Sequence, residues 1–191
     1  MRAVPCSTPT APPAAGSSSS TDRHVWATLN GRPGSIETYK EVPITTYISR
    51  EDVKPIIDLP HVTIEQAAAA LCEAVAQRGP DYVYPSRTCT YVSLNCPSCL
   101  VAEALSRLGV SVEQLQQLDD LGLDKVMIEQ DGEHFGVDAF ISELADWGFV
   151  NLRPEVLALF AEAQSLQDAH KTWGQAGAQA HVIITNQKEA A

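Results

Sequence analysis

The segment Thr63–Gly79 constrains the fold of this chain more than any other part of its sequence. Thr63 is an N-cap residue with Gln66 three positions later, which is the spacing of a capping box. Apolar residues then recur with a period near 3.6, as in a helix with one buried face, and Gly79-Pro80 ends the pattern. The segment therefore predicts an amphipathic helix. The residues on its apolar face are Ile64, Ala67, Ala68, Leu71, Cys72, Val75 and Ala76.

The same periodicity predicts further helices in the second half of the chain. The expected segments are the residues from Pro97 to Gly109, Ser111 to Leu121, Val137 to Trp147 and Pro154 to Ala169, and a short final helix or turn from Thr172. The stretch from Lys125 to Gly136 is left open between helix and strand, because its apolar residues suit either element. The expected fold is mainly α, a single domain of five or six helices with a small β-hairpin or short β element near the N-terminal half.

The first 60 residues differ in composition from the rest. Residues 1–22 are rich in Pro, Ala, Ser and Thr without an apolar period, which predicts a disordered tail. Residues 23–60 are enriched in β-branched and aromatic residues, so they are expected to form two or three short strands or an extended arm. A hairpin is also expected within residues 81–94. The expected organisation is a tail at 1–22, a β-leaning extended segment at 23–60 and a helical domain at 61–186.

Negative charge is concentrated in one part of the chain. Residues 109–168 contain thirteen acidic residues against two basic ones, a balance of −11 that equals the net charge of the whole protein. Such a segment repels nucleic acid, so direct DNA or RNA binding is disfavoured. It is interpreted either as a contact surface for a basic protein partner or as a solvated surface that maintains solubility. The candidate contact residues are Asp119, Asp120, Asp124, Asp131 and Glu133.

Hydropathy and cysteine content bear on the cellular compartment. No apolar run approaches the roughly 18 residues that a membrane span requires. Prolines, serines and a glycine fill residues 5–20, where a secretory signal would have a continuous apolar region. A cytoplasmic location is therefore expected. In a reducing compartment, five cysteines argue against a framework of structural disulfides.

Three cysteines within eleven residues form the main candidate for chemistry, since Cys89 lies in a β-like run and Cys96 and Cys99 lie at the start of a helix. One interpretation is a zinc site, in which His134 would supply the fourth ligand. A second is thiol redox chemistry, because a helix N-terminus lowers the pKa of a cysteine. The surrounding strands and helices do not alternate as in thioredoxin-like domains, and Asn95 stands where those domains have tryptophan. The third interpretation is structural packing of small thiols.

Several short words of the sequence resemble a group of bacterial and phage proteins. They are Tyr82-Val83-Tyr84-Pro85, Cys89-Thr90-Tyr91-Val92, Pro97-Ser98-Cys99-Leu100-Val101, Leu108-Gly109-Val110 and Thr172-Trp173-Gly174. With them, residues 64–176 resemble small uncharacterised proteins of actinobacteria and their phages. The resemblance implies a bacterial or phage cytoplasmic setting and brings no activity. Its pattern includes cysteines like Cys89 and Cys99 but none like Cys96, which weakens the redox and zinc interpretations.

No catalytic motif accompanies these features. The sequence contains no Gly-x-Ser-x-Gly, no glycine-rich phosphate loop and no His-Glu-x-x-His, and no catalytic residue is assigned. The sequence is therefore interpreted as an acidic, non-enzymatic protein-binding or regulatory module without a cofactor or a membrane partner. The alternatives are a thiol-redox or zinc-binding protein that uses Cys89, Cys96 and Cys99, and a structural component of a larger assembly.

Overall fold

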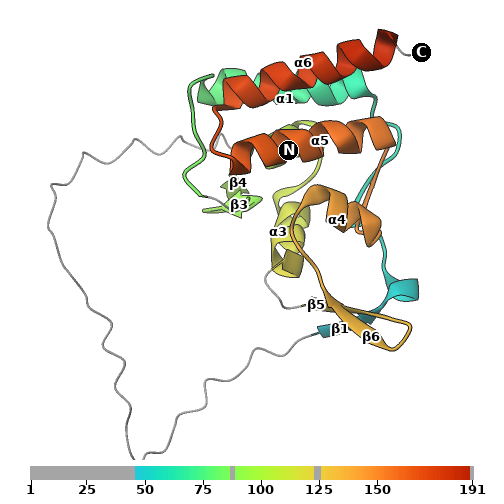
Figure 1. Ribbon diagram of the computed structural model, residues 1–191. Helices are drawn as coiled ribbons and strands as arrows, with labels where there is room; N and C mark the ends of the chain where they lie inside the picture. The colour runs from blue at the N-terminus through green and yellow to red at the C-terminus, as the bar shows by residue number, and fades with distance from the viewer. Residues whose placement is uncertain (1–45, 87–88, 123–125, 190–191) are drawn as a thin grey trace, which may run out of the picture. The chain divides into compact units, whose positions relative to one another are not determined.

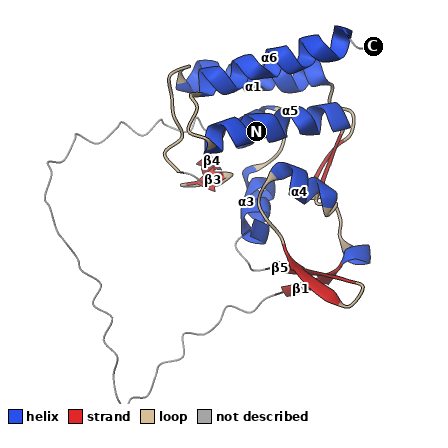
Figure 2. Cartoon of the chain, viewed as in Figure 1, coloured by secondary structure: helices blue, strands red, loops and turns tan. Residues whose placement is uncertain are grey.

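A computed structural model describes residues 46–86, 89–122 and 126–189 of the chain (Figures 1 and 2). These residues contain six α-helices and seven short strands. About half of these residues are helical, and the sheets are small. The described residues all belong to one unit. The predicted tail at residues 1–22 and most of the β-leaning segment lie outside them.

Helices α1 and α3 begin at the capping boxes that their sequences predict. Helix α1 spans Ile64–Arg78, and α3 spans Val112–Asp120. At the start of α1, the Gln66 backbone N–H donates to the Thr63 hydroxyl at 3.3 Å, and the Thr63 N–H donates to Gln66 Oε1 at 2.9 Å. Ser111 and Gln114 make the same reciprocal pair before α3. Both N-caps are confirmed, because each depends only on residues three positions apart.

The other helices follow their predicted segments with two differences in length. They are α2 at Leu100–Arg107, α4 at Ile141–Asp146, α5 at Pro154–Asp168 and α6 at Trp173–Glu189. Helix α4 begins four residues later than expected. The carbonyl of Ala139 instead accepts hydrogen bonds from the Tyr91 hydroxyl at 2.8 Å and from Gln164 Nε2 at 3.4 Å. Helix α6 has 17 residues, so the expectation of a short final helix or turn was wrong.

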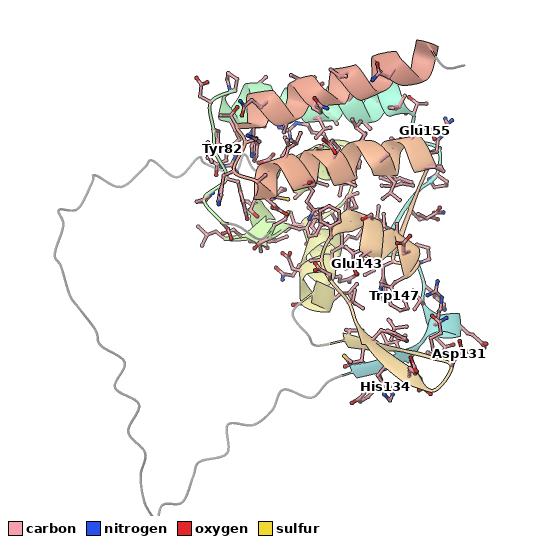
Figure 3. All side chains as sticks on the ribbon, viewed as in Figure 1. Tyr82, Asp131, His134, Glu143, Trp147 and Glu155 are labelled. Carbon is pink, nitrogen blue, oxygen red and sulfur yellow. The ribbon has the colours of Figure 1, made fainter. Side chains whose placement is uncertain are left out.

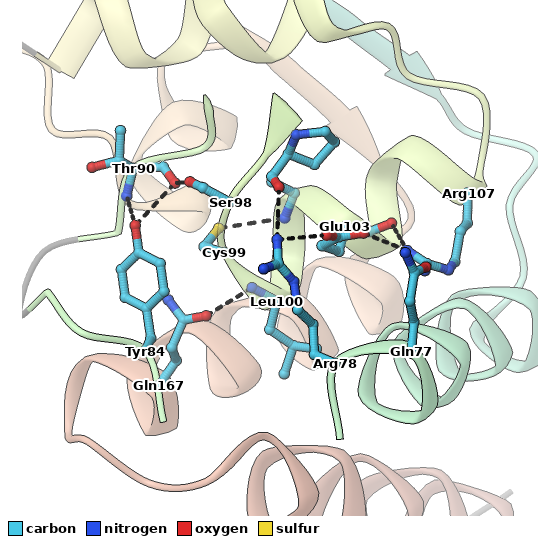
Figure 4. Close-up of polar contacts among 12 residues, drawn as sticks. Gln77, Arg78, Tyr84, Thr90, Ser98, Cys99, Leu100, Glu103, Arg107 and Gln167 are labelled. Carbon is cyan, nitrogen blue, oxygen red and sulfur yellow. Dashed lines mark hydrogen bonds and ion pairs between the residues drawn. The ribbon is translucent and has the colours of Figure 1, made fainter. Parts of the chain in front are cut away.

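The helices form a layer in which α1, α5 and α6 lie side by side and α2 packs against α1 and α5 (Figure 1). The largest fully buried side chains include Leu71, Leu105, Phe160 and Trp173. Between α1 and α2, the buried carboxylate of Glu103 accepts from Arg78 at 3.1 Å and from Arg107 at 2.9 Å (Figure 4).

Three small sheets accompany this helical layer. They consist of β1 (Thr46–Ser49), β5 (Val126–Gln130) and β6 (Glu133–Gly136); of β2 (Ile57–Leu59) and β7 (Val150–Leu152); and of β3 (Val92–Ser93) and β4 (Cys96–Pro97). Strands β1 and β2 run parallel to β5 and β7, respectively. The described end of the β-leaning segment is thus paired with strands from the region after residue 61. The stretch that the sequence left open becomes the antiparallel hairpin β5–β6.

The hairpin expected within residues 81–94 was wrong in its pairing. Val83 makes an isolated antiparallel bridge with Thr172, at the start of α6. The hairpin that does form joins β3 to β4 through Leu94 and Asn95, which have φ values of 51° and 59°. Two successive residues with positive φ form the type of tight turn that suits the twist of a hairpin.

The start of α6 packs closely against the end of α1, and this contact depends on Gly174. A Cβ at this position would lie 2.8 Å from the Pro80 carbonyl oxygen and 2.9 Å from Pro80 Cβ. We expect Gly174→Ala to lower the free energy of unfolding by about 1–3 kcal/mol, because backbone has to move to make room. Gly177→Ala in the same helix is the control, since its Cβ would meet only Val75 Cγ2 at 3.1 Å. Urea denaturation measures both variants, and equal stabilities would contradict this expectation.

Candidate functional site

Helix α2 begins at Cys99, in the stretch that the sequence singled out for chemistry. Cys99 is fully buried and is the N-cap residue, and its Sγ accepts a hydrogen bond from the Ala102 N–H at 3.4 Å (Figure 4). The Leu100 N–H donates to Oε1 of the buried Gln167 in α5 at 2.7 Å. These N–H groups at the helix start are therefore satisfied from within the protein.

Cys89 lies beside Cys99, and both are free thiols. The pKa of Cys89 is raised well above its ordinary value, first by the hydrogen bond with Cys99 and second by burial. The negative charges of Asp168 and Asp119 raise it further. A reactive cysteine needs an electropositive, accessible setting in which the thiolate is stabilised. Cys89 has the opposite setting, so it is a poor nucleophile and a poor metal ligand at neutral pH.

The other two residues of the predicted zinc or thiol site lie in different elements. Cys96 is in β4, where it pairs with Ser93 and is partly exposed. His134 is in β6, in a different sheet, where its ring meets Tyr47. Within residues 46–86, 89–122 and 126–189, no three His, Cys, Asp or Glu side chains are grouped so that they could hold a metal ion. The structure therefore does not bring His134 to the cysteines.

Asp119 was a candidate for the acidic contact surface, but its side chain lies inside the protein. It is 6% exposed, and its two carboxylate oxygens accept hydrogen bonds from the backbone N–H groups of Tyr91 at 2.7 Å and Val92 at 2.8 Å. Burial raises the pKa of this carboxyl above its ordinary value, and the two backbone donors lower it in part. Asp119 joins α3 to β3 and is not available to a partner.

A second set of polar contacts closes the same region. The Ser98 hydroxyl donates to the Thr90 carbonyl, and the Thr90 N–H donates to the Tyr84 hydroxyl at 3.3 Å (Figure 4). The Tyr91 ring is fully buried, and burial raises the pKa of its hydroxyl well above the ordinary value. These contacts make the region around Cys89 and Cys99 a packed joint between strand and helix, which is the structural interpretation of the cysteines.

The remaining acidic candidates are distributed over several elements. Asp131 and Glu133 are exposed at the turn and the first residue of β6 (Asp131 is labelled in Figure 3). Asp120 is partly buried at the end of α3, and Asp124 lies outside the described residues. Only the hairpin β5–β6 therefore carries described members of this set in fully exposed positions.

The sheet β1-β5-β6 presents two different faces. Its inner face contacts the rest of the protein, since Ile128 is fully buried. On the same face, the ring centroid of Phe135 lies 5.6 Å from that of Trp147, the C-cap residue of α4. On the opposite face, the rings of Tyr47 and His134 meet edge to face, with centroids 4.8 Å apart. Side chains alternate between faces, so Met127 and Glu129 of β5 share that face with them.

We call this second face the outer sheet face, formed by Tyr47, Ser49, Met127, Glu129 and His134. Tyr47 is 60% exposed although it is a large aromatic residue. This face was not among the sites that the sequence predicted. One local signal was present, because Asp131-Gly132 is a strong hairpin turn pair, and the two residues have φ values of 54° and 82°. The meeting of Tyr47 with His134 had no such signal.

Among the described residues, no helix has the length and apolar character to cross a membrane. The resemblance to actinobacterial and phage proteins stays a prediction, because no comparison with known proteins bears on it. No protein-family model matches the chain, and neither the curated proteins nor the solved structures contain a significant match to it.

Proposed function

We propose that this protein is a non-enzymatic protein-binding or regulatory module and that the outer sheet face is its contact surface. The observation that carries the proposal is the position of Tyr47, an aromatic side chain that is 60% exposed and braced by the ring of His134. Tyrosine is enriched at the energetically important centres of protein interfaces. A ring that is already held in place loses little conformational entropy when a partner covers it.

Charge around this face favours a basic partner. Glu129 lies on the face, and Asp131 and Glu133 are exposed at the hairpin end beside it. Arg50, which follows β1, is engaged elsewhere. Its guanidinium donates to Gln130 Oε1 and to the Asp146 carbonyl, both at 3.0 Å, and lies over the Trp147 ring. Among the described residues of the outer sheet face and its hairpin end, carboxylates are thus the charged groups that an approaching partner would meet.

The thiol alternative has less support from the geometry. Cys89 and Cys99 are buried, their neighbours include the carboxyl groups of Asp119 and Asp168, and the pKa of Cys89 is raised. The third hypothesis, a structural component of an assembly, would use the same outer sheet face for contacts between subunits. Light scattering of the wild-type protein and of Tyr47→Ala separates this hypothesis from binding to a different protein, because only the assembly hypothesis expects self-association through this face.

Site-specific photocrosslinking tests the proposal. The full chain would carry benzoylphenylalanine at position 47 or, as the control, at position 94, where Leu94 is 89% exposed on the β3–β4 turn. We expect irradiation in cells to give discrete adducts with another protein from position 47 only. For the partner identified in this way, Tyr47→Ala should weaken binding by about tenfold or more, and Leu94→Ala should have little effect. Equal adduct patterns from the two positions, or none from position 47, would contradict the proposal.

A further inference from the structure

We propose that β6 accepts an extended, basic segment of a partner protein as a fourth strand of the β1-β5-β6 sheet. This inference rests on the proposed function and specifies how the contact is made. Strand addition of this kind combines backbone hydrogen bonds, which supply affinity, with side-chain contacts, which supply specificity.

The position of β6 leaves one of its edges unpaired by the sheet. Among the strands that the structure describes the order is β1-β5-β6, so within residues 46–86, 89–122 and 126–189 β6 is an edge strand with β5 on one side only. The turn at Asp131 and Gly132 contains two residues, and therefore the flanking pair Gln130 and Glu133 is the hydrogen-bonded type. Pairs alternate along the ladder, so the backbone N–H and C=O groups of His134 point away from β5.

Gly136 is two residues further along and has the same orientation. The outward N–H and C=O groups of His134 and Gly136 together form what we call the docking edge. All four residues of β6 are exposed. Its sequence, Glu133-His134-Phe135-Gly136, contains no lysine and no proline, and its register with β5 contains no bulge. Lysine, proline and a bulge are among the usual features that prevent another strand from pairing with an edge, and β6 has none of the three.

Charge complementarity selects the occupant. Asp131 and Glu133 lie at the turn end of the docking edge, and Glu129 faces His134 across the ladder. A strand placed against β6 would run beside Asp131 and Glu133, with Glu129 one strand further away, so lysine or arginine side chains on that strand are favoured and acidic ones are disfavoured. The docking edge has two pairs of backbone groups, which matches a segment of about four to six residues.

A defined peptide probe tests this inference on the full-length protein. The probe is a fluorescent eight-residue peptide of alternating lysine and valine, and anisotropy at low ionic strength measures its affinity. We expect the unmodified peptide to bind and a version N-methylated at alternate residues to bind at least tenfold more weakly, because N-methylation removes the strand donors without changing the charge. Equal binding of the two peptides would overturn strand addition.

Two pairs of variants locate the binding on the protein. Asp131→Asn with Glu133→Gln should weaken binding about fivefold, while Glu73→Gln with Asp81→Asn, which removes the same charge from α1 and the loop after it, should change it less than twofold. His134→Pro removes an outward N–H and should weaken binding about tenfold relative to His134→Ala, which keeps it. Equal losses in the matched pairs would contradict the placement at β6.

The outcomes separate this inference from the function on which it rests. If position 47 gives adducts and the two peptides bind equally, the protein-binding function stands and strand addition is overturned. If position 47 gives no adducts and the N-methylated peptide binds more weakly than the unmodified one, the docking edge stands and the contact surface centred on Tyr47 is overturned. Circular dichroism of each variant identifies any that fail to fold, and the peptide comparison uses only wild-type protein.

Discussion

Replacement of Asp119 with alanine is expected to lower the free energy of unfolding by about 3 kcal/mol. The carboxylate accepts hydrogen bonds from the backbone N–H groups of Tyr91 and Val92 at 2.7 and 2.8 Å, and alanine would leave both donors buried without a partner. Each unsatisfied buried donor costs about 1–3 kcal/mol. The cost of burying the carboxylate itself offsets part of this, as its raised pKa indicates.

Urea denaturation at neutral pH measures this effect, with Gln117→Ala as the control on the exposed side of α3. The control should change stability by less than about 0.5 kcal/mol, as is usual for surface positions. Asp119→Asn should fall between the wild type and Asp119→Ala, because an amide keeps one acceptor oxygen and turns an NH₂ group toward the second donor. A loss below about 1 kcal/mol for Asp119→Ala would show that Asp119 does not hold α3 to β3.

The second large effect is expected at alkaline pH, where the free energy of unfolding should fall as the pH rises from 8 to 11. The pKa values of Cys89 and Tyr91 are raised well above the ordinary values of 9.0 and 10.0. Above those values the unfolded chain has released protons that the folded chain retains, so the free energy of unfolding falls as the pH rises. A group that is ionised in the unfolded chain and still protonated in the folded protein lowers the free energy of unfolding by about 1.4 kcal/mol per pH unit, and Cys89 reaches this range at a lower pH than Tyr91.

Urea denaturation across this pH range, in wild type and Cys89→Ala, checks this expectation. The variant is less stable at pH 8 because it lacks a buried thiol, but its free energy of unfolding should fall less steeply above pH 9, by up to about 1.4 kcal/mol per pH unit. Alkylation by iodoacetamide at pH 8 provides an independent measurement, and Cys89 should react far more slowly in the folded protein than in urea. Rapid alkylation in the folded state would contradict the packed joint and favour the thiol-redox alternative.

The helices were predictable because their signals are local. A capping box needs only residues three apart, such as Thr63 and Gln66 or Ser111 and Gln114, and the apolar period is readable within one segment. The start of α4 was not predictable, because the Ala139 carbonyl is held by Tyr91, which is 48 residues away. The pairing of Val83 with Thr172 and of β1 with β5 depends in the same way on distant partners.

The sequence by itself determined most of the helical segments, the N-caps Thr63 and Ser111, the concentration of acidic residues and the association of Cys89 and Cys99 with a strand-to-helix joint. Only the tertiary structure decided which of these groups face water. Asp119 and Asp131 are the same residue type within one acidic segment, yet Asp119 is buried and accepts hydrogen bonds from two backbone N–H groups, whereas Asp131 is exposed at a turn. Strand β1 pairs in parallel with one side of β5, and β6 pairs antiparallel with the other side. These two pairings bring Tyr47 of β1 to His134 of β6 across β5. Burial and proximity of this kind arise from contacts between distant segments, and no local pattern of residues encodes them.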